Sequence, residues 1–392
     1  MKLDGLSIFF FTVALGWTIF TLGRLRDLLY VRALPPVDAN DEPGPPPRVS
    51  VIVAARDEEH RIERSIGRLL EQQGVDLELI VVDDRSTDAT TTILARLAMQ
   101  NPRLRVLRVD TLPDGWLGKP HACHLGAAAA RGEWILFTDA DVWLAPDVVR
   151  RAVSAARRAT CDHVCLLPGE SETTLPARAL LLDFGLGMLF FTSRANRDRP
   201  SSFVGVGAFN LVRAEAYRAV GGHEPLRLEI IDDMMLGLSL RQAGYRTRGF
   251  GAPADVEVQW ASTAAGMIRA LEKNHFALLG YNLPLALAAI AGMSAMVAGA
   301  AVGPFVGGPA GLAAGLALLP VILPCWILSR RGGWGTLPAL LAPVMLAWLI
   351  AALAHSTLSA VRRGGIRWRG TFYPLAVLRA GRFRPRFGNR DR

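Results

Sequence analysis

The sequence predicts an α/β protein with a mostly parallel sheet and flanking transmembrane helices. Between residues 49 and 138, apolar β-branched segments typical of strands alternate with segments of helical periodicity. The strand segments are almost continuously apolar, which is typical of parallel strands covered by helices on both faces. Long uncharged stretches lie on either side of this region, at residues 5–23 and 276–329. About 20 such residues span a bilayer, so we expect a membrane protein.

The first apolar stretch predicts an uncleaved membrane anchor. Residues 5–23 carry no charge, Lys2 is a weak positive start, and no small-residue cleavage site follows. Three arginines lie within residues 24–32, and basic residues favour the cytoplasmic side of a membrane. We therefore expect residues 1–32 to be an N-terminal transmembrane anchor and the next domain to be cytoplasmic.

The elements of the polar region follow one another in a regular order. A Pro- and acid-rich linker is predicted at 33–48. The predicted strands are 49–55, 77–82, 104–109 and 134–138. The predicted helices between them are 58–73, 87–99 and 120–130. Ligands of such parallel sheets bind at the carboxyl ends of the strands, so the residues that follow each strand are the candidates for function.

Acidic side chains follow three of these strands. The run from Trp134 reads WILFTDAD, in which Asp139 and Asp141 are two residues apart and point the same way on an extended strand end. Two aligned carboxylates can hold Mg²⁺ or Mn²⁺, which usually take further ligands from water and a substrate diphosphate. Taken alone, the pair is also compatible with a solvated loop or a helix cap. Further acids occur at two other strand ends, in Arg56-Asp57-Glu58 and Asp83-Asp84.

Several classes of protein are disfavoured. Neither a Gly-x-Gly-x-x-Gly run after the first strand nor a Walker sequence is present. The net charge is +9 and the pI about 10, but the basic excess adjoins apolar segments, which fits anionic lipid headgroups. No interleaved aromatic and basic patch supports a nucleic-acid partner, and none is expected. The four cysteines lack zinc-site spacing, and for Cys123, flanked by His121 and His124, a packed helix face is favoured over a ligand site.

The C-terminal part predicts a transmembrane region at 276–360, for which the number of spans and the charge of the tail disagree. Two spans are expected near 278–302 and 305–328, and a third at 337–358. The tail, 361–392, holds ten arginines and one acid, which favours the cytoplasm. Three crossings from a cytoplasmic domain would place that tail outside, so one stretch is expected to be re-entrant or interfacial. The Gly- and Pro-rich second stretch is the candidate.

Five motifs, in this order, are similar to those of one enzyme family. They are VSVIVAARDEE from Val49, VVDDRSTD from Val81, WLGKPHACHLGAAAARG from Trp116, FTDAD from Phe137 and IIDDMMLGLSLRQAGYR from Ile230. Through them, residues 50–259 resemble the family 2 glycosyltransferases with a GT-A fold, the nucleotide-diphospho-sugar transferase fold. The first motif departs from the family pattern, because Ala54 and Asp57 stand where Pro and Asn are usual. The resemblance implies a cytoplasmic GT-A glycosyltransferase domain within 49–275.

The resemblance also implies a nucleotide-sugar donor and a divalent cation, Mg²⁺ or Mn²⁺. The expected metal ligands are Asp139 and Asp141, of which Asp141 is the favoured direct ligand. The expected donor-binding residues are Ala55, Arg56, Glu58, Asp83, Asp84, Lys119 and Asp139. In that set, Asp83 and Asp84 contact the nucleotide base and Lys119 contacts a phosphate. The alternative for Lys119 is an ordinary solvated lysine at a helix start. Asp88 is expected only to cap the next helix.

A catalytic base is expected at the start of a later helix. The resemblance assigns this role to Asp233 and a supporting role to Asp232, which replaces the usual Glu. A helix start stabilises an anion, and Asp233 would take the proton of the acceptor hydroxyl in a single inverting displacement. Simple helix capping is the alternative for the pair.

The acceptor is expected to be a membrane lipid. Residues 175–192 form a strongly apolar segment, either an interfacial helix or a buried core helix. Glycines in 205–210 are expected to let the donor or acceptor approach the backbone. Residues 258–260 keep only a fragment of the Gln-x-x-Arg-Trp motif of processive synthases, so transfer of one sugar to a lipid-like acceptor is favoured. A processive polysaccharide synthase and a non-catalytic membrane scaffold with a nucleotide-binding fold are the alternatives.

Overall fold

A computed structural model of the chain describes residues 4–37, 44–199 and 201–384. Lys2, the middle of the predicted linker and the end of the predicted tail lie outside the described residues. The contacts divide the chain into two compact units. The helical unit comprises Met1–Tyr30, Glu172–Phe190 and Trp260–Ala376, and the sheet unit comprises Val31–Ser171, Phe191–Gln259 and Val377–Arg392. Residues 172–190, predicted within the polar domain, thus group with the membrane-type helices.

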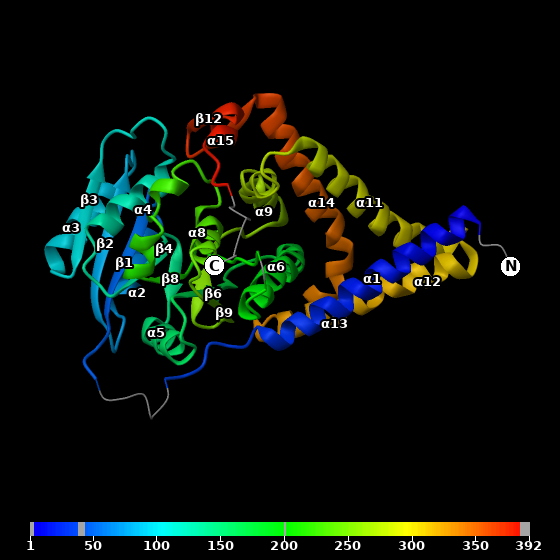
Figure 1. The fold of residues 1–392 in the computed structure, drawn as a ribbon, viewed down its shortest axis with the longest axis horizontal. Helices are drawn as coiled ribbons and strands as arrows, with labels where there is room; N and C mark the ends of the chain where they lie inside the picture. Colours follow the sequence, from blue (N-terminus) through cyan, green and yellow to red (C-terminus); the bar gives the residue numbers. More distant parts are fainter. Residues whose placement is uncertain (1–3, 38–43, 200, 385–392) are drawn as a thin grey trace, which may run out of the picture. The chain divides into compact units, whose positions relative to one another are not determined.

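A seven-stranded sheet forms the centre of the sheet unit (Figure 1), in the order β3-β2-β1-β4-β8-β6-β9. Its strands are β1 Arg48–Ala55, β2 Asp76–Asp84, β3 Leu104–Val109, β4 Trp134–Asp139, β6 His163–Leu167, β8 Asn210–Arg213 and β9 Thr247–Gly251. The first four strands in this order are parallel, β8 is antiparallel to both of its neighbours, and β6 and β9 are parallel. The predicted mostly parallel α/β sheet is confirmed.

Helices connect and cover these strands. They are α2 Ile62–Leu70, α3 Thr90–Gln100, α4 Gly118–Ala128, α5 Val148–Arg158, α7 Ala214–Ala219, the 3₁₀ turn η1 Glu224–Leu226 and α8 Asp232–Gln242. Three short strands, β5 Val142–Leu144, β7 Gly169–Glu170 and β10 Val256–Val258, make a second sheet. Successive residues Val51, Ile52 and Val53 of β1 are all fully buried. Since neighbouring strand residues point to opposite faces, both faces of the large sheet are covered.

The predicted helix 58–73 begins later than expected, at Ile62. Asp57 has a positive φ of 52°, which interrupts the backbone just after β1. The backbone N–H groups of Glu58 and Glu59 then donate to the side chains of Thr90 and Asp88, at 2.8 and 3.1 Å. These tertiary hydrogen bonds hold the segment outside the helix, and periodicity alone gave no sign of them.

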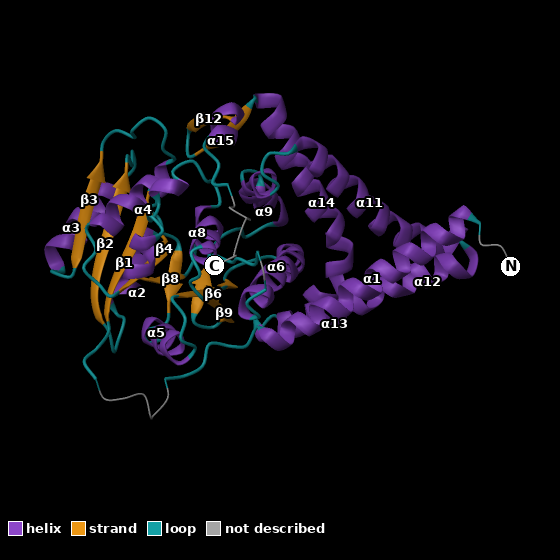
Figure 2. Ribbon diagram, viewed as in Figure 1, coloured by secondary structure: helices purple, strands orange, loops and turns teal. Residues whose placement is uncertain are grey.

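The helical unit is almost entirely helical apart from one hairpin (Figure 2). Its elements are α1 Gly5–Tyr30, α6 Leu175–Asn196, α9 Ala264–Leu271, α10 Asn274–Leu278, α11 Leu283–Val306, α12 Gly308–Leu318, η2 Leu319–Val321, α13 Ile322–Arg331, α14 Leu337–Arg363, β11 Gly365–Trp368, β12 Thr371–Pro374 and the start of α15 Leu375–Ala380. Both α6 and α15 continue into the sheet unit. Five described helical segments are long and apolar enough to cross a membrane. They are Gly5–Tyr30, Leu175–Asn196, Leu283–Val306, Gly308–Arg331 and Leu337–Arg363.

The Gly- and Pro-rich stretch suspected of being re-entrant is a broken helix. A 3₁₀ turn, η2, separates α12 from α13. Helices α11 and α12 approach closely at Gly303 and Gly311, where a Cβ on Gly311 would lie 2.0 Å from the carbonyl oxygen of Gly303. Small residues of this kind let apolar helices pack backbone to backbone. The number of membrane crossings stays a prediction.

Candidate active site

Strand register brings the strand-end acids to one edge of the large sheet. Ala55, the last residue of β1, pairs with Asp83 of β2, and Ala54 pairs with Asp139 of β4. The carboxyl ends of three parallel strands therefore lie side by side, and their acids lie at the edge where ligands of such sheets bind. The predicted convergence of these strand ends is confirmed.

Lys119, in the first turn of α4, lies among acids from separate elements. Its Nζ is 2.5 Å from Oδ1 of Asp139 at the end of β4. Burial opposes the charged form, but the carboxylates of Asp139, Asp232 and Asp233 outweigh it and raise the pKa of Lys119 well above its ordinary value. A permanently charged ammonium thus lies between the end of β4 and the start of α8.

Asp141, two residues after Asp139, feels the charges of two other acids. Burial, followed by the charges of Asp139 and Glu58, raises its pKa from 3.8 to about 7, and Arg61 opposes the shift. Glu58 is buried and its carboxylate lies 3.6 Å from Arg61. The charges of Asp139 and Glu58 thus act on Asp141, and carboxylate oxygens are ligands that a hard divalent cation such as Mg²⁺ or Mn²⁺ accepts.

Asp83 and Asp84 are both held by protein donors. Asp83 is buried and accepts hydrogen bonds from the backbone N–H of Ser86, the hydroxyl of Thr91 and the guanidinium of Arg108. Asp84 accepts two hydrogen bonds from Arg85, at 2.7 and 2.9 Å. The acid pair is thereby fixed in place at the sheet edge, and its contact with a nucleotide base stays a prediction.

Gly118 explains how Asp84 reaches the start of α4. A Cβ on Gly118 would lie 2.2 Å from Oδ2 of Asp84. The missing side chain therefore lets the carboxylate lie against the first turn of the helix, where the helix dipole favours negative charge.

The remaining residues of the first motif are placed as follows. Ala55 is buried, and Arg56 lies 3.9 Å from Asp57, its neighbour in the chain. The carboxylate of Asp57 accepts the backbone N–H of Thr87 at 2.7 Å. Asp88 accepts the backbone N–H groups of Thr90 and Glu59, which confirms its structural role. The loop after β1 is thus tied to the loop after β2, and donor contacts of Ala55 and Arg56 stay predictions.

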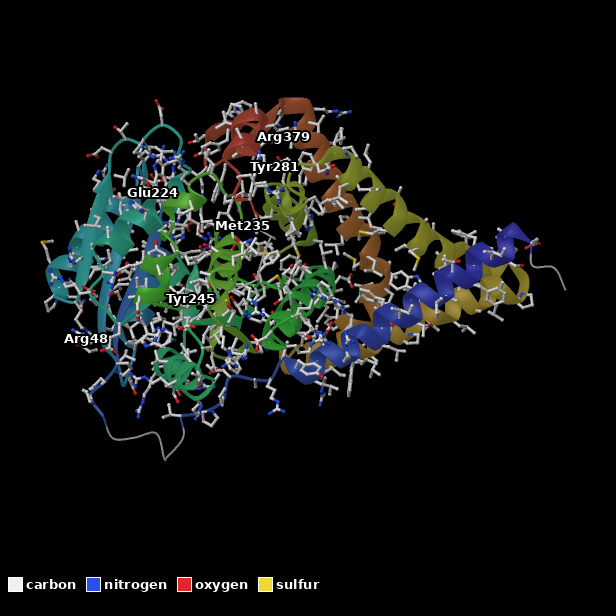
Figure 3. All side chains as sticks on the ribbon, in the orientation of Figure 1. Arg48, Glu224, Met235, Tyr245, Tyr281 and Arg379 are labelled. Atoms are coloured by element: carbon white, nitrogen blue, oxygen red, sulfur yellow. The ribbon has the colours of Figure 1, made fainter. Side chains whose placement is uncertain are left out.

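Asp232 and Asp233 are the first two residues of α8 (Met235 on this helix is labelled in Figure 3). Asp232 is buried, whereas Asp233 is partly accessible. Burial, followed by the charge of Asp232, raises the pKa of Asp233, while Lys119 opposes the shift. The Asp233 carboxylate also accepts the backbone N–H of Met234 at 2.8 Å. A partly accessible carboxylate with a raised pKa is a suitable general base near neutral pH.

Two glycines in the 205–210 segment lie against the protein's own site residues. A Cβ on Gly205 would lie 1.8 Å from the carbonyl oxygen of Asp233. One on Gly207 would lie 2.7 Å from Oδ2 of Asp139 and 3.2 Å from Nζ of Lys119. These glycines make room for the protein's own site residues, and the approach of donor or acceptor to the segment stays a prediction.

Gly207→Ala is expected to weaken Mn²⁺ binding with little loss of stability. The added methyl would displace the carboxylate of Asp139, and changes just behind a metal ligand typically cost roughly 10–100-fold in affinity. Isothermal titration calorimetry measures the affinity. The matched control is Gly67→Ala on α2, where a Cβ would meet nothing within 4 Å. Equal affinities for the two variants would contradict this assignment.

A buried polar network beneath α8 was missed by sequence reasoning. Asn210 at the start of β8 donates to the carbonyl oxygen of Asp233 at 3.4 Å. Its side-chain oxygen lies 2.6 Å from Nε2 of His163, whose Nδ1 lies 3.0 Å from the hydroxyl of Thr247. Burial lowers the pKa of His163 to about 4, so the ring is neutral. The network links three strands to the helix start, and no local pattern relates these residues.

For the helix around Cys123, the sequence favoured a packed face over a ligand site. Around Cys123, the rings of His121 and His124 both pack against Trp116, at 5.4 and 5.1 Å between ring centroids, which supports the packed-face interpretation.

Gln259, from the fragment at 258–260, accepts a hydrogen bond from Arg61 at 3.1 Å. Gln259 therefore reaches the arginine that neighbours Glu58.

Comparisons with known proteins were consistent with this geometry. Residues 50–221 match the model of Glycosyl transferase family 2. The 4,4'-diaponeurosporenoate glycosyltransferase of Staphylococcus haemolyticus is 34% identical over 199 residues, which are 50% of this chain and 52% of that protein. The beta-monoglucosyldiacylglycerol synthase of Nostoc sp. is 29% identical over 285 residues, which are 69% of this chain and 59% of that protein. The chain thus spans little more than half the length of these two relatives.

One solved structure supports the fold. The mannosyltransferase PcManGT of Pyrobaculum calidifontis, solved in complex with GDP-Man and Mn²⁺, has a TM-score of 0.54 and 21% identity. The match covers 89% of this chain and 99% of that one. At this level of identity the likeness is one of fold. The sheet, the ordered motifs and the family match agree: residues 50–221 resemble the family 2 glycosyltransferases, and the fold is a GT-A fold.

Proposed function

We propose that this chain is an inverting, metal-dependent glycosyltransferase that moves one sugar from a nucleotide-diphosphate sugar to a membrane lipid-like acceptor. The observation that carries the proposal is the position of Lys119. Its ammonium is surrounded by Asp139 from a strand end and by Asp232 and Asp233 from a helix start. Lys119 therefore lies near both the proposed metal-binding acids and the proposed base, and a single displacement needs such groups close to one bound substrate.

The donor is bound by charge. Lys119 provides a point charge for a phosphate oxygen, and Asp139 and Asp141, with Glu58 beside them, would hold the cation. When bound, the cation acts as a Lewis acid that stabilises the leaving diphosphate. The fixed acid pair Asp83-Asp84 would face the base of the nucleotide. The Mn²⁺ and GDP-Man in the PcManGT structure support this part of the proposal.

The acceptor is activated by Asp233. Its carboxylate takes the hydroxyl proton while that oxygen attacks the anomeric carbon and the diphosphate leaves from the opposite face. The raised pKa of Asp233 brings its proton affinity closer to neutral pH, which suits a base that must also release the proton. One displacement without a covalent intermediate inverts the anomeric configuration.

A lipid acceptor is favoured by the helices and by the relatives. Five helical segments of this chain are apolar enough to span a bilayer, and two relatives are named for a carotenoid acid and for a glucosyl diacylglycerol. We propose a multi-pass protein of the cell membrane with its sheet unit in the cytoplasm, where arginines follow the first span. Acceptor and donor would then meet at the membrane surface.

The test is a donor screen on native membranes. Radiolabelled nucleotide sugars are supplied with Mn²⁺ or Mg²⁺, and the label is followed into an organic extract. We expect one donor to label the lipid phase and EDTA to abolish the labelling. Label in a long polymer would indicate the processive synthase instead. Calorimetry that detects no nucleotide-sugar binding with Mn²⁺ present would indicate a non-catalytic scaffold.

A further inference from the structure

Three buried polar side chains meet behind the candidate base. They are Cys123 of α4, His223 just before η1, and Asp232 of α8, with exposed fractions of 3%, 1% and 3%. Their ligand atoms all lie within 4.8 Å of one another. Buried polar groups of this kind are almost always hydrogen-bonded, so the partners of His223 decide what the cluster does.

Tyr217 fixes one side of the His223 ring. Its hydroxyl oxygen accepts the backbone N–H of His223 at 3.1 Å and lies 2.8 Å from Nδ1 of the same residue. A hydroxyl has a single hydrogen to donate. In the arrangement that uses both roles of the hydroxyl, its oxygen accepts the backbone N–H and its hydrogen is donated to Nδ1. We assign the ring proton to Nε2 on this basis.

His223 then faces Asp232 with its donor nitrogen. Nε2 lies 3.5 Å from Oδ2 of Asp232. An imidazole that receives a hydrogen bond at Nδ1 carries a proton on Nε2, and the 3.5 Å contact places that nitrogen next to the Asp232 carboxylate at an ion-pair distance. Tyr217, His223 and Asp232 therefore form a relay that ends at the first residue of α8.

The relay is held rigidly by its surroundings. Phe137, two residues before Asp139 on β4, packs its ring 4.8 Å from His223 and 5.2 Å from Tyr217. Gly222 has a positive φ of 58°, and a Cβ there would lie 2.7 Å from the Tyr217 ring. The chain can therefore turn tightly over the tyrosine, which brings the histidine back into the core.

Asp232 is in turn a charged neighbour of both functional groups. Its carboxylate raises the pKa of Lys119 and that of Asp233. Successive residues of an α-helix point about 100° apart, so the two acids at the start of α8 face different surroundings. Asp232 is the inward one, and Asp233 is left partly accessible.

We propose that His223, held by Tyr217, is a positioning residue that fixes the Asp232 carboxylate inward and thereby sets the placement of Asp233 relative to Lys119. This inference rests on the proposed function, because Asp233 is the base in that reaction. The alternative for these side chains is a soft-metal site made by Cys123, His223 and Asp232. The hydrogen-bonded tyrosine and the aromatic packing satisfy the histidine without an ion.

The test compares His223→Phe, His223→Gln and the exposed control His60→Phe in the full chain in nanodiscs. His223→Phe is expected to lower kcat of sugar transfer by about 10²-fold, the typical cost of misplacing a reacting group by about 1 Å. Binding of UDP-glucose or GDP-mannose with Mn²⁺ should be unchanged, because Asp139 and Asp141 are untouched. His223→Gln keeps an amide donor and should regain part of the rate, and His60→Phe should match the unmodified protein.

Two results on these variants would overturn the inference. One is full kcat in His223→Phe. The other is a loss of nucleotide-sugar affinity as large as the loss of rate, which would indicate a general collapse of the site.

A second measurement covers the case in which His223→Phe does not fold or the unmodified protein transfers no sugar. Nitrogen-15 NMR of the histidines, assigned by the His223→Gln spectrum, is expected to give an Nε2–H tautomer that Tyr217→Phe alters. An Nδ1–H tautomer would contradict the relay. A metal site would also contradict the relay. In that case the unmodified protein would bind one equivalent of zinc, and both Cys123→Ala and His223→Gln would lose it. This readout needs no transferase activity, so it separates failure of the relay from failure of the proposed function.

Discussion

Asp233→Asn is expected to lower sugar transfer by about 10²–10⁴-fold, the range that a positioned general base contributes. Asparagine is almost isosteric, and its side-chain oxygen can still accept the backbone N–H of Met234 that Asp233 accepts at 2.8 Å. The start of α8 should therefore stay folded. The variant lacks the carboxylate that takes the proton, so the hydroxyl of the lipid-like substrate attacks without activation.

The measurement separates binding from chemistry. Calorimetry with the donor and Mn²⁺ should give an affinity close to that of the unmodified protein, whereas turnover should be nearly absent. The matched control is Asp147→Asn, an acid that precedes α5 and whose side chain is 56% exposed. Turnover in Asp233→Asn above half of the control value would show that another residue is the base.

Asp141→Asn is expected to abolish metal-dependent turnover and to stabilise the metal-free protein at neutral pH. The pKa of Asp141 rises from 3.8 to about 7 because burial and the charges of Asp139 and Glu58 disfavour its ionised form. A group with a raised folded-state pKa contributes stability that is fully present below its unfolded pKa and is lost as pH rises through its folded pKa. The metal-free protein should therefore lose stability between about pH 4 and pH 7, and the neutral amide should remove that loss.

The thermal unfolding temperature gives the readout without any enzyme assay. Unmodified protein should gain a clear Mn²⁺-dependent increase at about pH 7.5, because a ligand that binds only the folded state stabilises it. Without metal, the unfolding temperature of Asp141→Asn should be higher than that of the unmodified protein, and Mn²⁺ should raise it only a little. Asp110→Asn, at a side chain that is 80% exposed, is the control. An unchanged Mn²⁺ response in Asp141→Asn would show that this residue is not a ligand.

The sequence located the candidate acids where they directly follow or begin a continuous strand or helix. Strand β4 was readable as an apolar run that ends in Asp139-x-Asp141, and α8 as a helix that begins at Asp232-Asp233. Burial on both faces requires continuous apolar strands, and the carboxyl ends of parallel strands meet at one edge. These two rules suffice to place the acids of separate strands at the same sheet edge.

The errors came from interactions between distant residues. The helix predicted from residue 58 begins at Ile62 because Thr90 and Asp88 bind the intervening backbone. The role of Gly207 follows from its approach to Asp139 and Lys119. A sequence pattern records which residues are small or polar, but not which distant atom they face.

By itself, the sequence determined the order of the first four strands and the three helices between them, the membrane-type segments and the acids at the strand ends, whereas β6, β8, β9 and the second sheet came only from the structure. Periodicity and apolar length are local quantities, so they can be read along the chain. Only the tertiary structure decided that Lys119 lies among Asp139, Asp232 and Asp233, and that His223 faces Asp232. These pairings depend on how strands align and how helices pack, because charges and hydrogen bonds act over a few ångströms in space however far apart the residues are along the chain.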